Sequence, residues 1–131
     1  MNRNESATQE IGSHLEAFFY RVPKENHDAI AENLKKFVPW FEKAGIRIEY
    51  YQFAGSQPME GMSMLPIDRA LSASEDEEIW VELQYYRDRK HSEDTFAKMM
   101  HDKSLEPLGN EFLGLITKGS SLVMGGFDRL K

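Results

Sequence analysis

Residues 78–87 in the middle of the chain alternate between two sets of side chains, with the two-residue period of a β-strand. One set is apolar and consists of Ile79, Val81, Leu83 and Tyr85. The other set mixes aromatic and polar groups, namely Trp80, Glu82, Gln84 and Tyr86. The alternation predicts the central strand of a sheet. We expect the apolar set to lie under helices and the mixed set to face another subunit, since an interface needs buried area together with polar groups that pair.

Two further stretches, residues 14–22 and 46–53, alternate in the same way and predict two more strands. Each carries one glutamate flanked by aromatic side chains, Glu16 in the first and Glu49 in the second. We expect these glutamates on the same mixed face as Glu82. The predicted dimer face therefore comprises Phe18, Tyr20, Glu49, Tyr51, Trp80 and Glu82.

Helical patterns separate the strands. An amphipathic helix follows Pro23 and runs to about Ala44, with Pro39 predicting a kink near Lys35. A second helix, capped by Asp88 or Ser92, should end near Asp102 with Phe96, Met99 and Met100 facing inward. A short helical segment, broken by Gly109 and Gly114, follows Ser104, and residues 120–130 predict a last strand. The order predicts an α+β fold, the ferredoxin-like βαββαβ arrangement with an antiparallel sheet and helices on one face only.

Residues 54–77 form a long connection between two neighbouring strands, and we call this segment the arm. It carries apolar side chains that a solvated loop does not need: Met59, Met62, Met64, Leu65 and Ile67. Such side chains can cover the cleft of their own subunit or hold a partner. A self-packed surface loop is the alternative.

The composition limits the classes of protein to which the chain can belong. At 131 residues it has the size of one domain, which we place at 14–131 after a flexible N-terminal tail at 1–13. The net charge of −6 argues against nucleic acid or an anionic membrane as partner. The absence of cysteine excludes disulfides and thiolate metal sites. Since no apolar run approaches the length of a membrane span, we expect a cytoplasmic protein.

Several short stretches resemble a known family over nearly the whole chain. They are Leu-Glu-Ala-Phe at 15–18, Val-Pro-Lys at 22–24, Glu-Tyr at 49–50, Ala-Lys-Met-Met at 97–100 with Asp102, and Gly-Gly-Phe-Asp at 125–128. On these residues the chain resembles the YbaA-like family of unknown function, in the dimeric α/β-barrel superfamily. The resemblance implies a ferredoxin-like homodimer, and it implies no reaction, since no catalytic residues are established for that family.

A few side chains are candidates for chemistry. His14 and Glu16 lie two apart on one strand and can form an acid–base pair or an interface hydrogen bond. His91 and Asp94 have helical spacing for a metal, but an exposed helix face explains them more simply. Tyr50 and Tyr85 are expected on the helix side, as core residues or lining a cleft. The candidate ligand-binding residues are Tyr50, Tyr85, His14, Glu16, Met62 and Met64. We expect neither a bound metal nor a cofactor, since no ligand set with suitable spacing is present.

Together these patterns predict a homodimeric small-molecule binding or sensing domain with a cleft between sheet and helices. Two alternatives remain open. One is a cofactor-independent enzyme, monooxygenase-like or isomerase-like, acting on a small apolar substrate. The other is a purely structural dimer module.

Overall fold

A computed structural model describes residues 12–119 and 121–130. Its strands are β1 His14–Pro23, β2 Arg47–Gln52, β3 Glu77–Tyr86 and β4 Leu122–Asp128. Its helices are α2 His27–Lys43, α3 Ile67–Ala70, α4 Arg89–His101 and α5 Glu106–Leu115, with 3₁₀ turns at Lys24–Asn26 and Lys103–Leu105. The strands form one antiparallel sheet in the order β2-β3-β1-β4, which confirms the ferredoxin-like α+β fold. Most of the predicted N-terminal tail, residues 1–11, lies outside the described residues.

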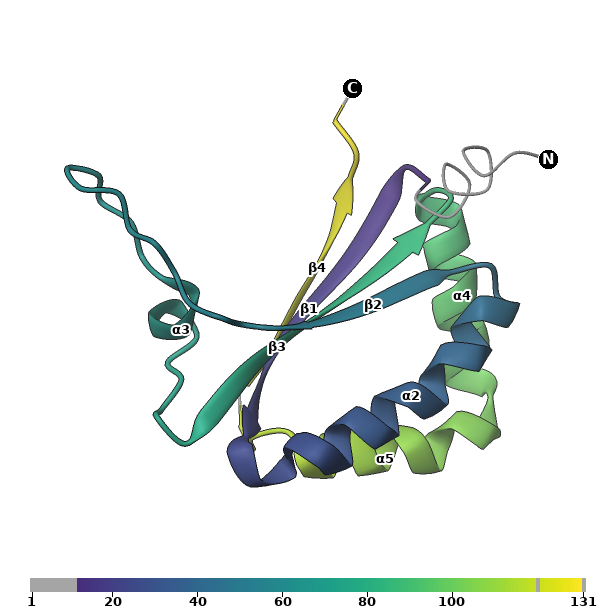
Figure 1. Cartoon of the computed structure of the whole chain (residues 1–131). Coiled ribbons are helices and arrows are strands. Elements are labelled where there is room, and N and C mark those ends of the chain that lie inside the picture. Colours follow the sequence, from purple (N-terminus) through teal and green to yellow (C-terminus); the bar gives the residue numbers. More distant parts are fainter. Residues whose placement is uncertain (1–11, 120, 131) are drawn as a thin grey trace, which may run out of the picture.

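Helices α2, α4 and α5 lie together on one side of the sheet, as Figure 1 shows. Helix α2 continues through Pro39, and α4 begins where predicted, because the Asp88 carboxylate accepts a hydrogen bond of 2.8 Å from the backbone N–H of His91. Helix α5 is not broken by Gly109 or Gly114, so that prediction was wrong. Packing of α5 on α2 outweighs the helix cost of about 1 kcal/mol for each glycine. Within the described ranges, no helix is long and apolar enough to cross a membrane.

The mixed set of strand side chains lies under these helices, so the prediction that it faces another subunit was wrong. Tyr20 lies opposite Trp80, and Phe18 lies opposite Glu82. Tyr20 and Trp80 are buried in the main core, which contains Tyr20, Val22, Ile30, Leu34, Trp80 and Ile116. Phe18 packs against the same core. The predicted dimer face therefore loses Phe18, Tyr20, Trp80 and Glu82.

The other side of the sheet, which we call the open face, is covered by none of the three long helices (Figure 1). Strand register places there most of the apolar set that we expected under the helices, together with residues of β1 and β2: Val81, Leu83, Tyr85, Leu15, Phe19, Arg47, Glu49 and Tyr51. Ile79, the remaining member of that set, is buried. Glu49 and Tyr51 do lie on the face without helices, as predicted, because Glu49 pairs with Leu83 and Tyr51 pairs with Val81. The three glutamates thus do not share one face.

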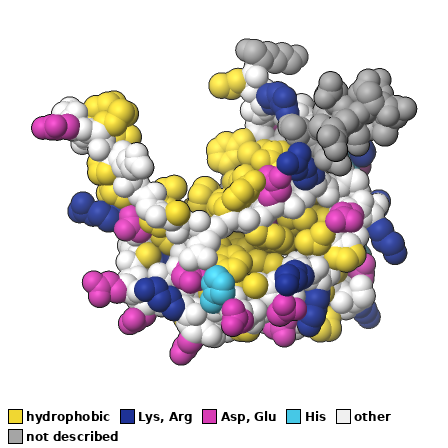
Figure 2. Space-filling view, viewed as in Figure 1, with side chains coloured by type: hydrophobic (Ala, Val, Ile, Leu, Met, Phe, Trp, Pro, Cys, Tyr) yellow, Lys and Arg dark blue, Asp and Glu magenta, His cyan; other side chains and the backbone are white. Residues whose placement is uncertain are grey.

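The arm, residues 54–77, projects away from the sheet and the helices (Figure 1). Its apolar side chains are exposed, including Met62 at 57%, Met64 at 49% and Leu65 at 66%. Figure 2 shows hydrophobic side chains both on the arm and over the sheet in the middle of the same view. The arm therefore does not cover a cleft of its own subunit, contrary to one of our three interpretations of it.

Candidate functional site

A cavity of about 160 Å³ lies between the helix-covered face of the sheet and the helices. Every strand and all three long helices contribute to its wall. The lining residues are Phe18 and Tyr20 from β1, Leu34, Phe37 and Phe41 from α2, Tyr50 from β2, Glu82 and Gln84 from β3, Phe96 and Met99 from α4, Phe112 from α5, and Leu122 from β4. The wall is dominated by aromatic and aliphatic groups with few polar ones, as in most small-molecule sites.

The polar groups of the cavity form a chain along β3. Gln84 donates from Nε2 to Oε2 of Glu82 over 2.5 Å, and Tyr86 donates its hydroxyl to Oε1 of Gln84 over 2.6 Å. Tyr20 donates a longer hydrogen bond of 3.5 Å to Oε1 of Glu82. These hydrogen bonds orient the Glu82 carboxyl group, and Glu82 remains in contact with the cavity.

The acidity of Glu82 follows from this environment. Burial among apolar side chains raises the pKa of Glu82 to about 7, although the hydrogen bonds from Gln84 and Tyr20 act in the opposite direction. No cationic side chain is present among the described residues that line the cavity. Near neutral pH, Glu82 is therefore present in both the acid and the carboxylate form, which suits a group that exchanges protons.

Tyr50 contributes the second polar group of interest. Its hydroxyl is buried and has no hydrogen-bond partner within residues 12–119 and 121–130. Burial, together with the nearby Glu82 carboxylate, raises the pKa of Tyr50, so the hydroxyl stays a neutral donor. Since buried polar groups are almost always paired, an unpaired hydroxyl in a cavity wall indicates a site for an acceptor from outside the chain.

The other predicted tyrosine, Tyr85, lies on the open face, where the Arg47 guanidinium sits 5.7 Å from the centre of its ring. It does not line the cavity, so its expected place on the helix side was wrong. Met62 and Met64 are also absent from the cavity wall, because the arm extends away from it.

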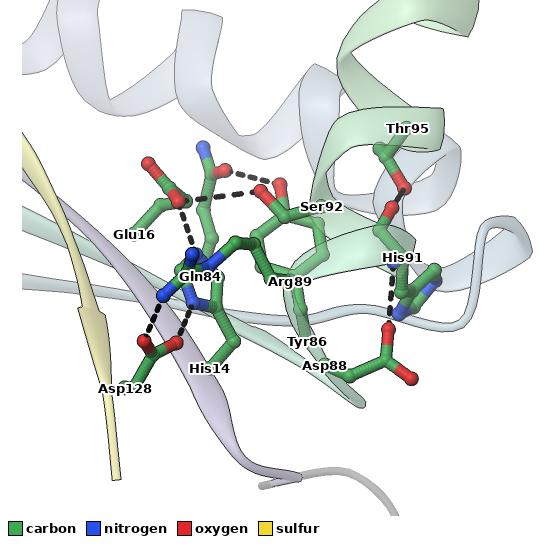
Figure 3. Close-up of polar contacts among 10 residues, drawn as sticks. All are labelled: His14, Glu16, Gln84, Tyr86, Asp88, Arg89, His91, Ser92, Thr95 and Asp128. Carbon is green, nitrogen blue, oxygen red and sulfur yellow. Dashed lines mark hydrogen bonds and ion pairs between the residues drawn. The ribbon is translucent and has the colours of Figure 1, made fainter.

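His14 and Glu16 are in contact, but in a separate cluster at the N-terminal end of α4 (Figure 3). The His14 ring contacts Glu16 through Nε2 and Asp128 through Nδ1, the latter over 2.8 Å. Burial alone would lower the pKa of His14, but the hydrogen bonds with Asp128 and Glu16 raise it overall. Ser92 also donates to Glu16, and Arg89 pairs with Asp128. The cluster ties α4, β1 and β4 together, and none of its residues lines the cavity.

His91 is buried, so the expectation of an exposed helix face was wrong for it. Its Nε2 lies 2.8 Å from the backbone oxygen of Ala44, and its Nδ1 accepts from the backbone N–H of Arg87. Asp94 instead binds Lys90 on the surface. Among the described residues, no group of three or more histidine, aspartate or glutamate side chains could hold a metal ion.

Sequence analysis did not predict most of the cavity-lining residues as ligand-binding residues. Glu82, Phe18 and Tyr20 were assigned to a dimer interface, and the helix residues were treated as ordinary core. A carboxylate and an amide within an aromatic strand face suit a polar cleft as well as an interface, and that pattern was the available signal.

Comparison with known proteins identifies a family but gives no information about activity. A family model described as "Protein of unknown function (DUF1428)" matches residues 13–113. No curated protein matches the chain. One similar solved structure is a mutant of SnoaB, a cofactor-independent oxygenase from Streptomyces nogalater. It has 11% sequence identity and a TM-score of 0.48, over 91% of this chain and 94% of that one. A similarity this low says nothing about the activity of the present chain.

Proposed function

The chain belongs to the DUF1428 family of unknown function, and we propose from its own geometry that it binds a small, neutral, largely apolar molecule in the cavity between sheet and helices. The unpaired Tyr50 hydroxyl in the cavity wall is the observation that carries this proposal. An unpaired buried hydroxyl costs about 1 to 3 kcal/mol, and a ligand that presents an acceptor recovers that cost.

The size and chemistry of the cavity define the ligand class. A dry cavity of about 150 Å³ can hold a benzene ring, so the cavity of about 160 Å³ suits a ligand built on one ring. Its walls carry five phenylalanines, Phe18, Phe37, Phe41, Phe96 and Phe112. A phenol fits the polar groups as well, because its oxygen can accept from Tyr50 while its hydroxyl donates to the Glu82 carboxylate.

Binding of 4-methylphenol, measured by isothermal titration calorimetry, tests the proposal. The wild type should bind it saturably, and Tyr50→Phe should weaken binding about 3- to 10-fold, the value of one hydrogen bond. Without ligand, Tyr50→Phe should raise the free energy of unfolding by about 1 kcal/mol, because an unpaired buried hydroxyl is removed. The matched control is Tyr51→Phe, which changes the neighbouring residue on the open face. Equal effects of the two substitutions, or no saturable binding by the wild type, would contradict the proposal.

We also propose that the functional unit is a homodimer joined through the open face. Phe19, Val81 and Leu83 are neighbours on this face and are each partly exposed, and a contiguous apolar surface often marks a protein–protein contact. Its charged groups already form a pair: Arg47 donates to Glu49 over 2.9 Å, and Tyr51 donates to the same carboxylate over 2.8 Å. Burial alone would raise the pKa of Glu49, but these hydrogen bonds lower it overall. A second copy can therefore cover the face without burying an unpaired charge.

Val81→Glu should convert the dimer into a monomer at micromolar concentration. The substitution places a charge at the centre of β3, which must lose its hydration when a second copy covers the face. Sedimentation velocity measures the outcome. Lys36→Glu, on an exposed part of α2, introduces the same side chain away from the open face and should leave the dimer intact. A monomeric wild type, or a Val81→Glu dimer as tight as that of the wild type, would exclude this interface.

A further inference from the structure

The two polar groups of the cavity are arranged like a base and a hydrogen-bond donor at one reacting centre. Tyr50 and Glu82 are directly opposite each other on the paired strands β2 and β3. Opposite residues in an antiparallel pair have Cβ atoms about 4.5 to 5.5 Å apart, and both of these residues line the cavity. A bound molecule therefore meets a carboxyl group and a phenolic hydroxyl side by side.

We propose that the cavity catalyses proton transfer at the carbon atom next to the carbonyl group of a small neutral ketone, with Glu82 as the general base and Tyr50 as the donor to the carbonyl oxygen. The inference rests on the binding function proposed above and goes beyond it by assigning a reaction.

The protonation states suit these roles. Glu82, with a pKa of about 7, is basic enough to accept a proton and is still largely ionised just above neutral pH. Tyr50 keeps its proton because burial and the Glu82 charge raise its pKa. Its hydroxyl has no partner in the described chain, so it is available to the substrate oxygen. Gln84 and Tyr20 donate to Glu82 and fix the orientation of its carboxyl group.

The reaction needs no oxidant, reductant or second substrate. The Glu82 carboxylate removes a proton from the carbon beside the carbonyl group. The electron pair of that C–H bond forms the carbon–carbon double bond of an enolate, and the carbonyl π electrons move to the oxygen. The Tyr50 hydroxyl stabilises the developing negative charge by a hydrogen bond. The protonated Glu82 then returns a proton to the same carbon or to a conjugated position, which regenerates the ketone or gives its isomer.

The walls of the cavity select the substrate. They are mainly aromatic and aliphatic, and no lysine or arginine is among the described residues that line them. A substrate carboxylate or phosphate would therefore be desolvated beside Glu82 without a counter-charge. The preferred substrate is thus an uncharged ketone on a single ring.

The test uses phenylacetone (1-phenylpropan-2-one) in deuterated buffer, with loss of its benzylic proton signal followed by NMR. The wild type should accelerate exchange at least about 100-fold over buffer, the lower end of what a general base contributes, with a rate that rises with pH and levels off above about pH 7. Glu82→Gln should lose at least about 100-fold of the acceleration, the usual contribution of a general base. Tyr50→Phe should lose about 10-fold or more. Glu93→Gln, on an exposed position of α4, is the matched control and should exchange like the wild type.

Binding of phenylacetone is measured separately by calorimetry on the same variants. Saturable binding with exchange that depends on Glu82 supports the proposal. Binding without accelerated exchange, or exchange that persists in Glu82→Gln, overturns the proposed reaction and leaves the binding function standing. Failure to bind both phenylacetone and 4-methylphenol overturns both proposals.

Discussion

Trp80→Ala should lower the free energy of unfolding by about 3 to 5 kcal/mol, the usual cost of removing a buried aromatic side chain. Trp80 is 7% exposed and belongs to the main core beneath the helices. Its Nε1 donates to Glu78 over 2.9 Å, and its ring packs edge-on against His27 at a centroid distance of 5.4 Å. The substitution therefore removes core contacts, a hydrogen bond and an aromatic pair together. Urea denaturation measures the change.

Tyr51→Ala is the control for Trp80→Ala, since Tyr51 is an aromatic residue of the neighbouring strand on the open face. It is 51% exposed in the single chain. Its truncation should change the stability of the monomer by less than about 1 kcal/mol. If Trp80→Ala weakened only the association of subunits while Tyr51→Ala unfolded them, the two faces of the sheet would be assigned the wrong way round.

Glu82→Gln should stabilise the protein increasingly as the pH rises. The pKa of Glu82 is about 7 in the folded chain and 4.5 in the unfolded reference. Below about pH 4.5 Glu82 is protonated in both the folded and the unfolded chain, so its burial as a charge does not lower the unfolding free energy. Between these values the unfolded chain has lost its proton while the folded chain still holds one, so wild-type stability falls as pH rises. Above about pH 7 the loss of unfolding free energy caused by the buried Glu82 carboxylate is constant, at roughly 3 kcal/mol.

The difference in unfolding free energy between Glu82→Gln and wild type should therefore grow by about 3 kcal/mol from pH 4 to pH 8. Denaturation at a series of pH values measures it, and contributions from other groups cancel in the difference. Glu93→Gln makes the same replacement at an exposed position of α4 and is the control, which should not reproduce the growth seen for Glu82→Gln. A flat difference for Glu82→Gln would show that Glu82 is ionised in an ordinary aqueous environment.

The strands, their order and the fold class were predictable because each depends on local patterns. Alternation located β1, β2 and β3, and the helical patterns between them left the ferredoxin-like order as the simplest connection. Asp88 was one of two predicted caps, and the side chain of Asp88 does accept the hydrogen bond at the start of α4. These features need only the period of a strand, the period of a helix and the chemistry of a helix end.

Which face of the sheet received the helices was not predictable from alternation. Parity divides a strand into two sets of side chains but does not say which set the helices cover. The prediction placed the more uniformly apolar set inside, with Val81 and Leu83. In the structure the mixed set is inside, because Glu82, Gln84 and Tyr86 satisfy one another through hydrogen bonds along the strand. Mutual pairing of this kind removes most of the penalty for burying polar groups.

The cavity was only partly predictable for a related reason. Tyr50 was expected on the helix side and lies there, in the cavity wall. Phe37 and Phe96 come from two helices that are far apart in the sequence, and their shared cavity depends on how α2 and α4 pack over the sheet. His91 was misjudged because its partner is a backbone oxygen, Ala44 O, which no side-chain pattern reveals. Contacts between distant elements and hydrogen bonds to the backbone appear only in the folded chain.

A crystal structure of the protein soaked with 4-methylphenol tests the central claim, occupation of the cavity between sheet and helices. The account predicts density for the ring among Phe37, Phe96 and Phe112, with its oxygen within hydrogen-bond distance of the Tyr50 hydroxyl and of the Glu82 carboxyl group. An unoccupied cavity, or a ring bound only on the arm or the open face, would contradict it.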